Sequence, residues 1–499
     1  MKQKRKIVFC GVEEPLDVSP ERYGLALSYP FEYLAAFALQ NKEIAGNFEF
    51  ETLLANRNAF DEDIIFDIAA RNPRMAGFSC SVKNIGRCLR IARQLKLACP
   101  ETLIILGGPE MYAAERLMQK HSFIDLAVFG EGEETFSETL LSVLAGETGK
   151  IPGLFRRAGG KIVSGGPRKP IERLDSIPSF FTPEKAAAVS GIALYETARG
   201  CPNKCSYCLW SPYSKRYFSM KRVKREIGLL LENDDIERIW FIDSDFDSDV
   251  ERSKEILRFV KKKRKPGLEL SAFLNFHTPD EELLALVAEL FHEVPVGIQT
   301  VKRNLQKNIG RDWFDIAEFE KNLGKILSFI PAHKLYIDLM YGLPGEKPGD
   351  FADTLMWCLA RGLTHINFFR LSVFPGAPLE KIARKSGLIF DPEPPHLVYS
   401  SDTFSFDDLI AIETEIVNYK VLETLLPPES LSKLAASDAF TDILRNLSRC
   451  DPDFETRFVC INESNISDID IRKLAAPVTE FLRKYKIDKE ILDSARSRR

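Results

Sequence analysis

The chain has no long hydrophobic run and no strong excess of either charge sign. None of its segments reaches the ~18 apolar residues of a membrane-spanning helix, and its amino-terminal apolar run is too short for a signal peptide. The formal net charge of −4 provides no basic field for nucleic acid, and the run "KKKRK" (261–265) reads as a solvated helix end. We therefore expect a cytoplasmic protein with no membrane span and no nucleic-acid partner.

Most of the ten cysteines show no ligand pattern. The cytoplasm keeps thiols reduced, and buried cysteines behave as small hydrophobic residues. Seven cysteines fit that description: Cys10, Cys80, Cys88, Cys99, Cys358, Cys450 and Cys460. The other three, Cys201, Cys205 and Cys208, are clustered and need a separate explanation.

Residues 5–145 alternate short apolar runs with helical patterns, which predicts a parallel sheet wrapped by helices. Small residues follow three of the runs: Ser79 and Ser81, Gly107 and Gly108, and Gly130 and Gly132. Ligands of open parallel sheets bind beyond the carboxyl ends of the strands, where small residues let a bulky cofactor approach. No G-x-G-x-x-G follows the first run, which disfavours an ordinary dinucleotide fold. Alternatively, the glycines only close tight turns.

The rest of the chain predicts a second α/β domain and a helical end. Residues 151–189 read as a linker with a hairpin that turns at Gly159 and Gly160. Six strand-like runs follow, at 191–197, 238–243, 269–273, 295–299, 334–341 and 365–371. Six β/α units predict an open, partial TIM barrel with its active site at the carboxyl ends of the strands. The expected domains are 1–150, the linker 151–189, the barrel 190–385 and a mainly helical region 386–499.

The stretch "ARGCPNKCSYCLW" places Cys201, Cys205 and Cys208 directly after the first barrel strand. Structural zinc takes four protein ligands, and three cysteines on so short a loop are atypical of catalytic zinc. A [4Fe-4S] cluster held by three thiolates keeps one iron open for a substrate or cofactor. The C-x3-C-x2-C spacing therefore favours such a cluster.

This spacing, with Tyr207 before the last cysteine, resembles the hallmark of the radical SAM superfamily. In that family the open iron chelates S-adenosylmethionine, whose cleavage gives a 5′-deoxyadenosyl radical that abstracts hydrogen. "IWFIDSDFD", "VPVGIQT" and "DLMYGLPGE" are similar to the family's next strand ends. The resemblance implies that the residues binding S-adenosylmethionine include Tyr207, Asp243, Asp245, Gln299, Thr300 and Gly342. Alternatively, Asp245 caps the next helix.

The stretches "GFSCSVKN", "IILGGPEM" and "IDLAVFGEGEETFSETL" resemble the cobalamin-binding domain joined to many radical SAM enzymes. The resemblance implies cobalamin contacts at Ser79, Ser81, Gly107, Gly108, Gly130, Glu131 and Gly132. The D-x-H-x-x-G motif, whose histidine ligates cobalt, is absent after the first strand, and His121 lies outside that context. Cobalamin is therefore expected without a histidine lower ligand.

Together, these resemblances imply a cobalamin-dependent radical SAM enzyme that methylates an unactivated centre of a small molecule or peptide. A hydrocarbon C–H bond offers no usable acid or lone pair, so acid–base and nucleophilic catalysis cannot reach it. Such an enzyme needs an external electron donor of the flavodoxin or ferredoxin type. Three alternatives stay open: rearrangement or cyclisation without methyl transfer, methylthiotransfer, and a non-enzymatic cofactor carrier or sensor. The cofactor-bearing strand edges of the two domains should face each other across one cavity.

Overall fold

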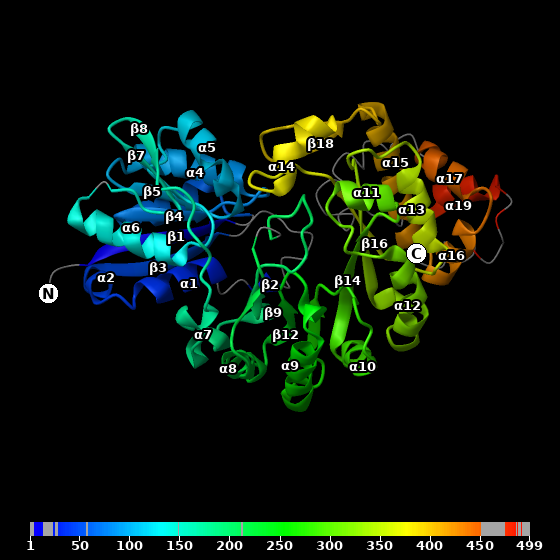
Figure 1. Ribbon diagram of the computed structural model, residues 1–499, viewed down its shortest axis with the longest axis horizontal. Helices are drawn as coiled ribbons and strands as arrows, with labels where there is room; N and C mark the ends of the chain where they lie inside the picture. The colour runs from blue at the N-terminus through cyan, green and yellow to red at the C-terminus, as the bar shows by residue number, and fades with distance from the viewer. Residues whose placement is uncertain are drawn as a thin grey trace.

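The computed structural model describes residues 4–12, 23–24, 28–55, 58–147, 149–210, 213–450, 475–485, 487 and 491. Two α/β lobes lie side by side, and the carboxyl-terminal helices pack beyond the second lobe (Figure 1). Among the described residues, no helix is both long enough and apolar enough to cross a membrane.

The amino-terminal lobe is a seven-stranded sheet in the order β3-β1-β4-β5-β6-β7-β8. Its parallel strands are β1 (Arg5–Val12), β3 (Phe48–Ala55), β4 (Met75–Ser79), β5 (Leu103–Gly107) and β6 (Leu126–Val128). Side chains of β1 alternate between two cores, because successive residues of a strand point to opposite faces. One core packs against α3 (Asp61–Ala70), α4 (Ile85–Ala98) and α5 (Ala114–Lys120). The other packs against α1 (Tyr29–Ala38), α2 (Lys42–Asn47) and α6 (Glu133–Ala145).

The predicted hairpin forms, with Gly159 and Gly160 at positive φ between β7 (Leu154–Ala158) and β8 (Lys161–Ser164). β7 pairs antiparallel with β6, so the hairpin extends the amino-terminal sheet. This pairing covers the edge of β6, which would otherwise present unpaired backbone groups. The sheet thus continues to Ser164, past the boundary at residue 150 that the sequence suggested.

The second lobe is a curled sheet in the order β16-β15-β14-β13-β12-β9-β2. All six predicted strands form and are parallel: β9 (Ser190–Tyr195), β12 (Ile236–Phe241), β13 (Glu269–Ala272), β14 (Phe291–Gln299), β15 (Leu335–Tyr341) and β16 (Ile366–Arg370). β2 (Tyr23–Gly24) adds an antiparallel edge next to β9. The alternating helices are α8 (Met220–Leu231), α9 (Val250–Lys263), α10 (Glu281–Leu290), α12 (Ile316–Phe329) and α13 (Asp350–Leu359). The sheet is therefore the predicted partial barrel.

The carboxyl-terminal region is helical, as predicted, with α15 (Phe406–Leu425), α16 (Pro428–Ala435), α17 (Phe440–Asn446) and α19 (Ala475–Arg483). Ser405 caps the start of α15 and forms a capping box with Asp408. The Tyr419 hydroxyl donates to the Thr364 carbonyl at 2.5 Å, and its ring lies 5.7 Å from that of Phe368 on β16. α15 therefore covers the β16 side of the barrel. Cys460 and the side chain of Cys450 lie outside the described residues.

Candidate functional site

The loop that carries the three cysteines follows β9 and β10 (Ala198–Arg199), at the carboxyl end of the barrel strands. Its base is closed by pairing of β10 with β11 (Arg216–Tyr217) and by the Cys201 N–H, which donates to the Tyr213 carbonyl at 3.0 Å. Gly200 has φ 81°, and a Cβ there would lie 2.4 Å from the Ser214 carbonyl oxygen. The turn into the loop therefore requires glycine.

The thiols of this loop suit a cluster better than a single ion. Cys205 is buried, Cys201 and Cys208 are half-buried, and none forms a disulfide. Across the described chain, no three Cys, His, Asp or Glu side chains converge as ligands of one metal ion. In a [4Fe-4S] cluster each thiolate binds a different iron, so the sulfurs surround a larger group and need not converge. The donor set therefore fits that cluster.

A buried cation, Arg311, lies against the loop. It is 4% exposed, its Nη1 donates to the Cys205 Sγ at 3.6 Å, and its Nη2 donates to the Gly297 carbonyl. Its guanidinium lies 4.4 Å from the ring of Trp313, and its charge also acts on the buried Asp338, whose pKa it lowers against the larger effect of burial. A buried charge is costly unless an opposite charge compensates it. We therefore expect negative charge at Cys205, as a cluster with thiolate ligands provides.

Replacing Arg311 by glutamine should lower the midpoint reduction potential of the cluster by about 60 mV or more, because a nearby positive charge favours the reduced state. The potential is measured by an anaerobic redox titration followed by electron paramagnetic resonance, with iron content checked in parallel. Arg361→Gln is the matched control, since Arg361 also stacks on a tryptophan, Trp357, but pairs with Glu320 on the surface. Equal potentials in the Arg311 and Arg361 variants would contradict this role.

The two predicted acidic residues after β12 differ in their partners. Asp243 accepts the backbone N–H groups of Thr197 and Ala198 at 2.7 and 3.1 Å and the Thr197 hydroxyl, so both its oxygens hold the start of the cysteine loop. Asp245 accepts Asn203 Nδ2 at 2.9 Å through one oxygen, while its other oxygen is buried without a partner. Its side chain makes no helix-capping hydrogen bond. Of the two acids, Asp245 is the one with a carboxylate oxygen left for a ligand's amino group, and the buried Asp247 lies within side-chain hydrogen-bond reach of the same carboxylate.

His277, which the sequence reasoning missed, lies 3.2 Å from the Asp245 carboxylate. The hydrogen bond to Asp245 raises the pKa of His277 above its usual value. Burial raises the pKa of Asp245, but the hydrogen bond and charge of His277 together with the charge of Lys215 outweigh it, so the net shift is downward. The pair therefore favours an ionised carboxylate beside the cysteine loop. Its position just past β13, at the active edge of the barrel, was the available signal.

The remaining predicted residues for S-adenosylmethionine lie along the same edge. Gln299 ends β14 at φ 66° with a buried Oε1 that has no partner, and the Thr300 hydroxyl lies 3.3 Å from that of Thr354. Gly342 follows β15, and Tyr207 lies beside Cys205 and Cys208. Gln299 and Asp245 thus present unpaired oxygens at one edge, which fits a polar ligand there.

The turn after β15 also holds a buried acid, Glu346, which accepts the Leu343 N–H at 2.8 Å. Burial raises its pKa to about 7. The folded state thus retains a proton that the unfolded chain loses near its ordinary pKa, so stability should fall as pH rises through that interval. Glu346→Gln should remove this pH dependence. The difference in free energy of unfolding between the variant and the native protein should therefore change by roughly 2–3 kcal/mol between about pH 5 and about pH 8. Thermal unfolding of the native and variant proteins at both pH values tests this. A stability difference between the two proteins that is the same at both pH values would contradict it.

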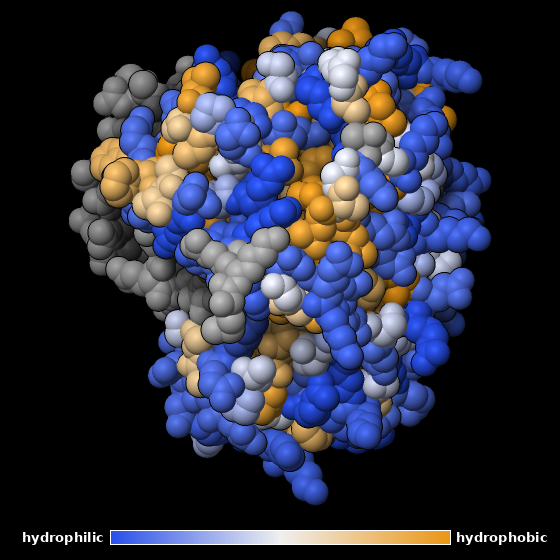
Figure 2. Space-filling model, turned by 90° about the vertical axis from the view of Figure 1, so that its left-hand side faces the viewer, coloured by the Kyte–Doolittle hydropathy of each residue, from blue (hydrophilic) through white to orange (hydrophobic). Residues whose placement is uncertain are grey.

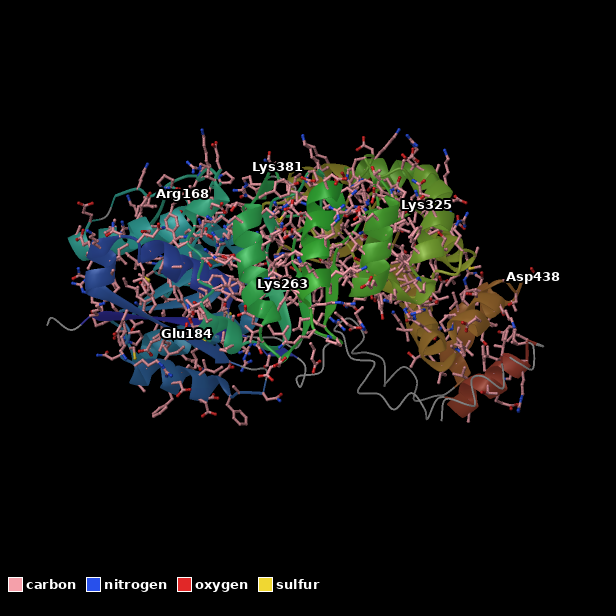
Figure 3. All side chains as sticks on the ribbon, turned by 90° about the horizontal axis from the view of Figure 1, so that it is seen from below. Arg168, Glu184, Lys263, Lys325, Lys381 and Asp438 are labelled. Atoms are coloured by element: carbon pink, nitrogen blue, oxygen red, sulfur yellow. The ribbon has the colours of Figure 1, made fainter. Side chains whose placement is uncertain are left out.

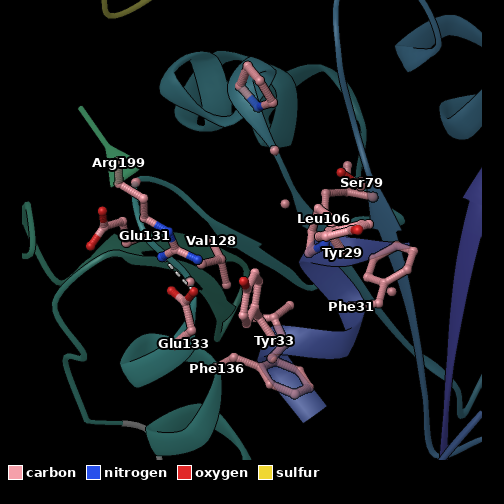
Figure 4. A pocket seen from close by; sticks show the side chains of 18 of the residues that line it. Tyr29, Phe31, Tyr33, Ser79, Leu106, Val128, Glu131, Glu133, Phe136 and Arg199 are labelled. Carbon is pink, nitrogen blue, oxygen red and sulfur yellow. Dashed lines mark ion pairs between the residues drawn. The ribbon is translucent and has the colours of Figure 1, made fainter. Parts of the chain in front are cut away.

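A cavity of about 500 Å³ lies between the two lobes (Figure 4). The amino-terminal lobe lines it with Ser79, Gly107, Gly108, Gly130, Glu131 and Gly132, and the barrel with Gly200, Leu209, Trp210 and Tyr213. The strand ends of the amino-terminal lobe therefore face the two ends of the cysteine loop across this cavity, whereas the three cysteines and the predicted residues for S-adenosylmethionine are not among its lining residues. Ser81 is not among the lining residues. Its backbone N–H donates a hydrogen bond to Asn84 Oδ1, at the start of α4. Gly108 has φ 93°, and a Cβ there would lie 2.5 Å from the Cys80 carbonyl oxygen.

Aromatic side chains that the sequence reasoning missed line the inner part of the cavity: Tyr29, Phe31, Tyr33 and Phe136 (Figure 4). They belong to α1 and α6. The spacing of aromatic residues in these helices predicts only buried core side chains. Ion pairs of 2.7 Å between Arg199 and Glu133 and 2.6 Å between Arg216 and Glu131 join the lobes at the cavity wall. Because these charges neutralise each other, the cavity suits a large, mostly uncharged ligand.

No histidine is among the described residues that line the cavity. His121 is not among the lining residues and lies beside Phe123, and residues 13–22 are outside the described part of the chain. The described lining thus fits a cobalamin held without a histidine lower ligand.

Family models match two parts of the chain: "B12 binding domain" over residues 33–140 and "Radical SAM superfamily" over residues 195–358. The chain therefore combines an amino-terminal B12-binding domain with a central radical SAM domain. Its curated relatives include 2-(S-pantetheinyl)-carbapenam-3-carboxylate methyltransferase of Streptantibioticus cattleyicolor, 27% identical over 70% of this chain and 54% of that protein. Another is the cobalamin-dependent radical SAM methyltransferase TokK of Streptomyces tokunonensis, 26% identical over 75% of this chain and 56% of that protein. The chain spans about half the length of these relatives.

Solved structures support the fold. The methyltransferase TsrM of Kitasatospora setae, with cobalamin and a [4Fe-4S] cluster bound, matches with a TM-score of 0.62 at 19% identity, over 80% of this chain and 79% of that one. The apo cobalamin-dependent S-adenosylmethionine radical enzyme OxsB matches with a TM-score of 0.66 at 14% identity, over 99% of this chain and 83% of that one. The second match extends through the helical end of the chain.

Proposed function

We propose that this chain is a cobalamin-dependent radical SAM methyltransferase that binds a [4Fe-4S] cluster, S-adenosylmethionine and cobalamin. The observation that carries the proposal is the single cavity onto which both the glycine-rich strand ends and the cysteine loop open. The names of the two methyltransferase relatives described above support methyl transfer as the reaction, whereas other relatives, at 24–25% identity, are named tRNA-2-methylthio-N(6)-dimethylallyladenosine synthase. The substrate is an unactivated centre of a small molecule or peptide.

Each cofactor has its own set of residues in this proposal. Cys201, Cys205 and Cys208 hold the cluster, and Asp245 and Gln299 supply the free oxygens that bind S-adenosylmethionine. The cavity would hold cobalamin beside Gly107 at the end of β5 and Gly130 and Gly132 after β6. When bound, these groups supply hydrogen abstraction and methyl transfer.

The protein's own residues position these groups and keep water away. The aromatic side chains of α1 and α6 exclude water from the inner cavity. The ion pairs from Arg199 and Arg216 hold the two lobes at a fixed separation across it. Holding the reacting groups in the right orientation can account for a large share of the reduction in the activation barrier.

Methylthiotransfer is disfavoured, since that reaction is associated with three further ligating cysteines in the amino-terminal domain. Cys10, Cys80 and Cys88 are fully buried in the core of the sheet. Burial raises the pKa of Cys10 to about 12, which opposes formation of a thiolate ligand. The other two alternatives, rearrangement without methyl transfer and a non-catalytic carrier, differ from methyl transfer in the products formed from S-adenosylmethionine.

The test is an anaerobic assay of reconstituted, reduced protein with S-adenosylmethionine that carries a deuterated methyl group. A radical SAM methyltransferase should form 5′-deoxyadenosine by reductive cleavage and S-adenosylhomocysteine by loss of the labelled methyl group. 5′-Deoxyadenosine alone would favour rearrangement and contradict methyl transfer. If neither product forms, the non-catalytic cofactor carrier is favoured.

We also propose a cytoplasmic location and a one-electron donor, because the free cysteines and the cluster require a reducing compartment.

A further inference from the structure

The cysteine loop has a second side, away from the cavity, where two short helical segments contact it. The Ser206 N–H donates to the Ile309 carbonyl at 2.8 Å, directly after α11 (Arg303–Asn308). The Ser206 carbonyl accepts the Leu379 N–H of α14 (Pro378–Ile382) at 2.7 Å. Neither Lys204 nor Ser206 lines the cavity, whereas Gly200, Leu209, Trp210 and Tyr213 do. The middle of the loop is thus reached from outside through α11 and α14.

These contacting segments are strongly basic. The exposed basic residues on and next to them are Lys204, Arg303, Lys307, Lys381, Arg384 and Lys385, which we name the basic surface. The exposed acids in the same region are Glu380, Asp312, Asp315 and Asp402. Within the described residues, Arg303 is the member of the basic surface that forms an ion pair, with Asp315 at 4.0 Å. Ile382 and Ile389, 40% and 64% exposed, add apolar area next to it. In a chain of net charge −4, six basic side chains thus lie near the cysteine loop against four exposed acidic ones.

We propose that the basic surface docks an acidic one-electron redox protein of the flavodoxin type, which reduces the cluster. This inference rests on the proposed function. One electron passes from the reduced flavin, which is oxidised, to the cluster, which is reduced, and no atom is transferred. Lys204 is next to the cluster ligand Cys205, so docking here brings the donor close to the acceptor. The cavity on the other side of the loop stays free for the substrate.

Charge complementarity explains why the partner is acidic. Opposite charges steer two proteins into encounter and raise the association rate, and the effect weakens with salt. The remaining surface offers a comparison in the basic residues of α9 and α12, such as Lys262, Lys263 and Lys321. α9 and α14 lie at opposite ends of the barrel (Figure 1), and Figure 3 labels Lys263 and Lys381. The two groups carry similar charge but only one adjoins the cysteine loop.

The experiment compares two triple charge reversals in the reconstituted full chain. The first is Lys307→Glu with Lys381→Glu and Arg384→Glu, which leaves the cysteine loop untouched. The matched control is Lys262→Glu with Lys263→Glu and Lys321→Glu. Cluster reduction is followed by anaerobic stopped-flow absorbance at low salt, with photoreduced flavodoxin as donor. Photoreduced 5-deazariboflavin, a small uncharged reductant, serves as the reference donor.

With flavodoxin, the first variant should react about tenfold more slowly than the native protein, and the control variant should match the native protein. The difference should shrink at high salt, and both variants should react normally with the deazaflavin. Equal flavodoxin rates in the first variant and the native protein, or an equal loss in both variants, would overturn the docking surface. A native protein whose cluster neither reductant reduces would overturn the proposed function instead.

Discussion

Cys205→Ala should abolish both the visible absorbance of the iron–sulfur cluster and the cleavage of S-adenosylmethionine. A cluster held by three thiolates has no spare ligand, and Cys205 is the buried thiol that accepts the Arg311 hydrogen bond at 3.6 Å. The variant also leaves the Arg311 charge without its anionic partner, so the site cannot recover by small rearrangement. Iron content, absorbance and 5′-deoxyadenosine are measured on the same anaerobic sample.

The matched control is Cys99→Ala, at a half-buried cysteine that ends α4 in the other lobe. It should retain iron and cleavage at native levels, because nothing in the proposed site contacts it. Retention of both properties by Cys205→Ala would remove this cysteine from the ligand set. Their loss in the Cys99 variant would mean that iron binding does not depend on the loop alone.

Gly107→Phe should reduce cobalamin affinity by about 10- to 100-fold while leaving the iron content unchanged. Gly107 ends β5 and lines the cavity, and a Cβ there would meet only the Phe78 carbonyl oxygen, at 4.0 Å. The added ring therefore occupies cavity space without straining the backbone. Bound cobalt per chain is measured after gel filtration in excess cobalamin.

Gly86→Phe serves as the comparison, because Gly86 is exposed on α4 in the same lobe with no atom near its added Cβ. Its cobalt content should match that of the native protein. A Gly107 variant with full cobalt would show that cobalamin does not lie against β5. A Gly107 variant that loses iron as well would show a general folding defect, which is contrary to the open space at this position.

The sequence predicted the elements whose signals are local. Each barrel strand is a short apolar run, and the three cysteines form one contiguous pattern after the first of them. The glycines at the strand ends could be placed on one edge, since the carboxyl ends of parallel strands meet there. Six of the seven predicted cobalamin residues accordingly line the cavity, and Ser81 differs because it bonds Asn84 at the start of α4.

The features that escaped prediction depend on contacts between distant parts of the chain. Arg311 is 106 residues from Cys205, and nothing in its local sequence shows that it is buried against a thiol. The aromatic residues of α1 read as core residues until the position of the second lobe is known. The hairpin turn was visible in the sequence, but its pairing with β6 was not, because both edges of a hairpin can accept a neighbouring strand.

The central claim is that one chain holds both cofactors on one cavity. The most direct test is anaerobic metal analysis of protein produced with cobalamin available, with cobalt, iron and sulfide counted together. The account predicts about one cobalt and about four irons per chain. Four irons without cobalt, even after reconstitution with cobalamin, would contradict it, since the amino-terminal lobe would then hold no cobalamin and the methyltransferase proposal would fail.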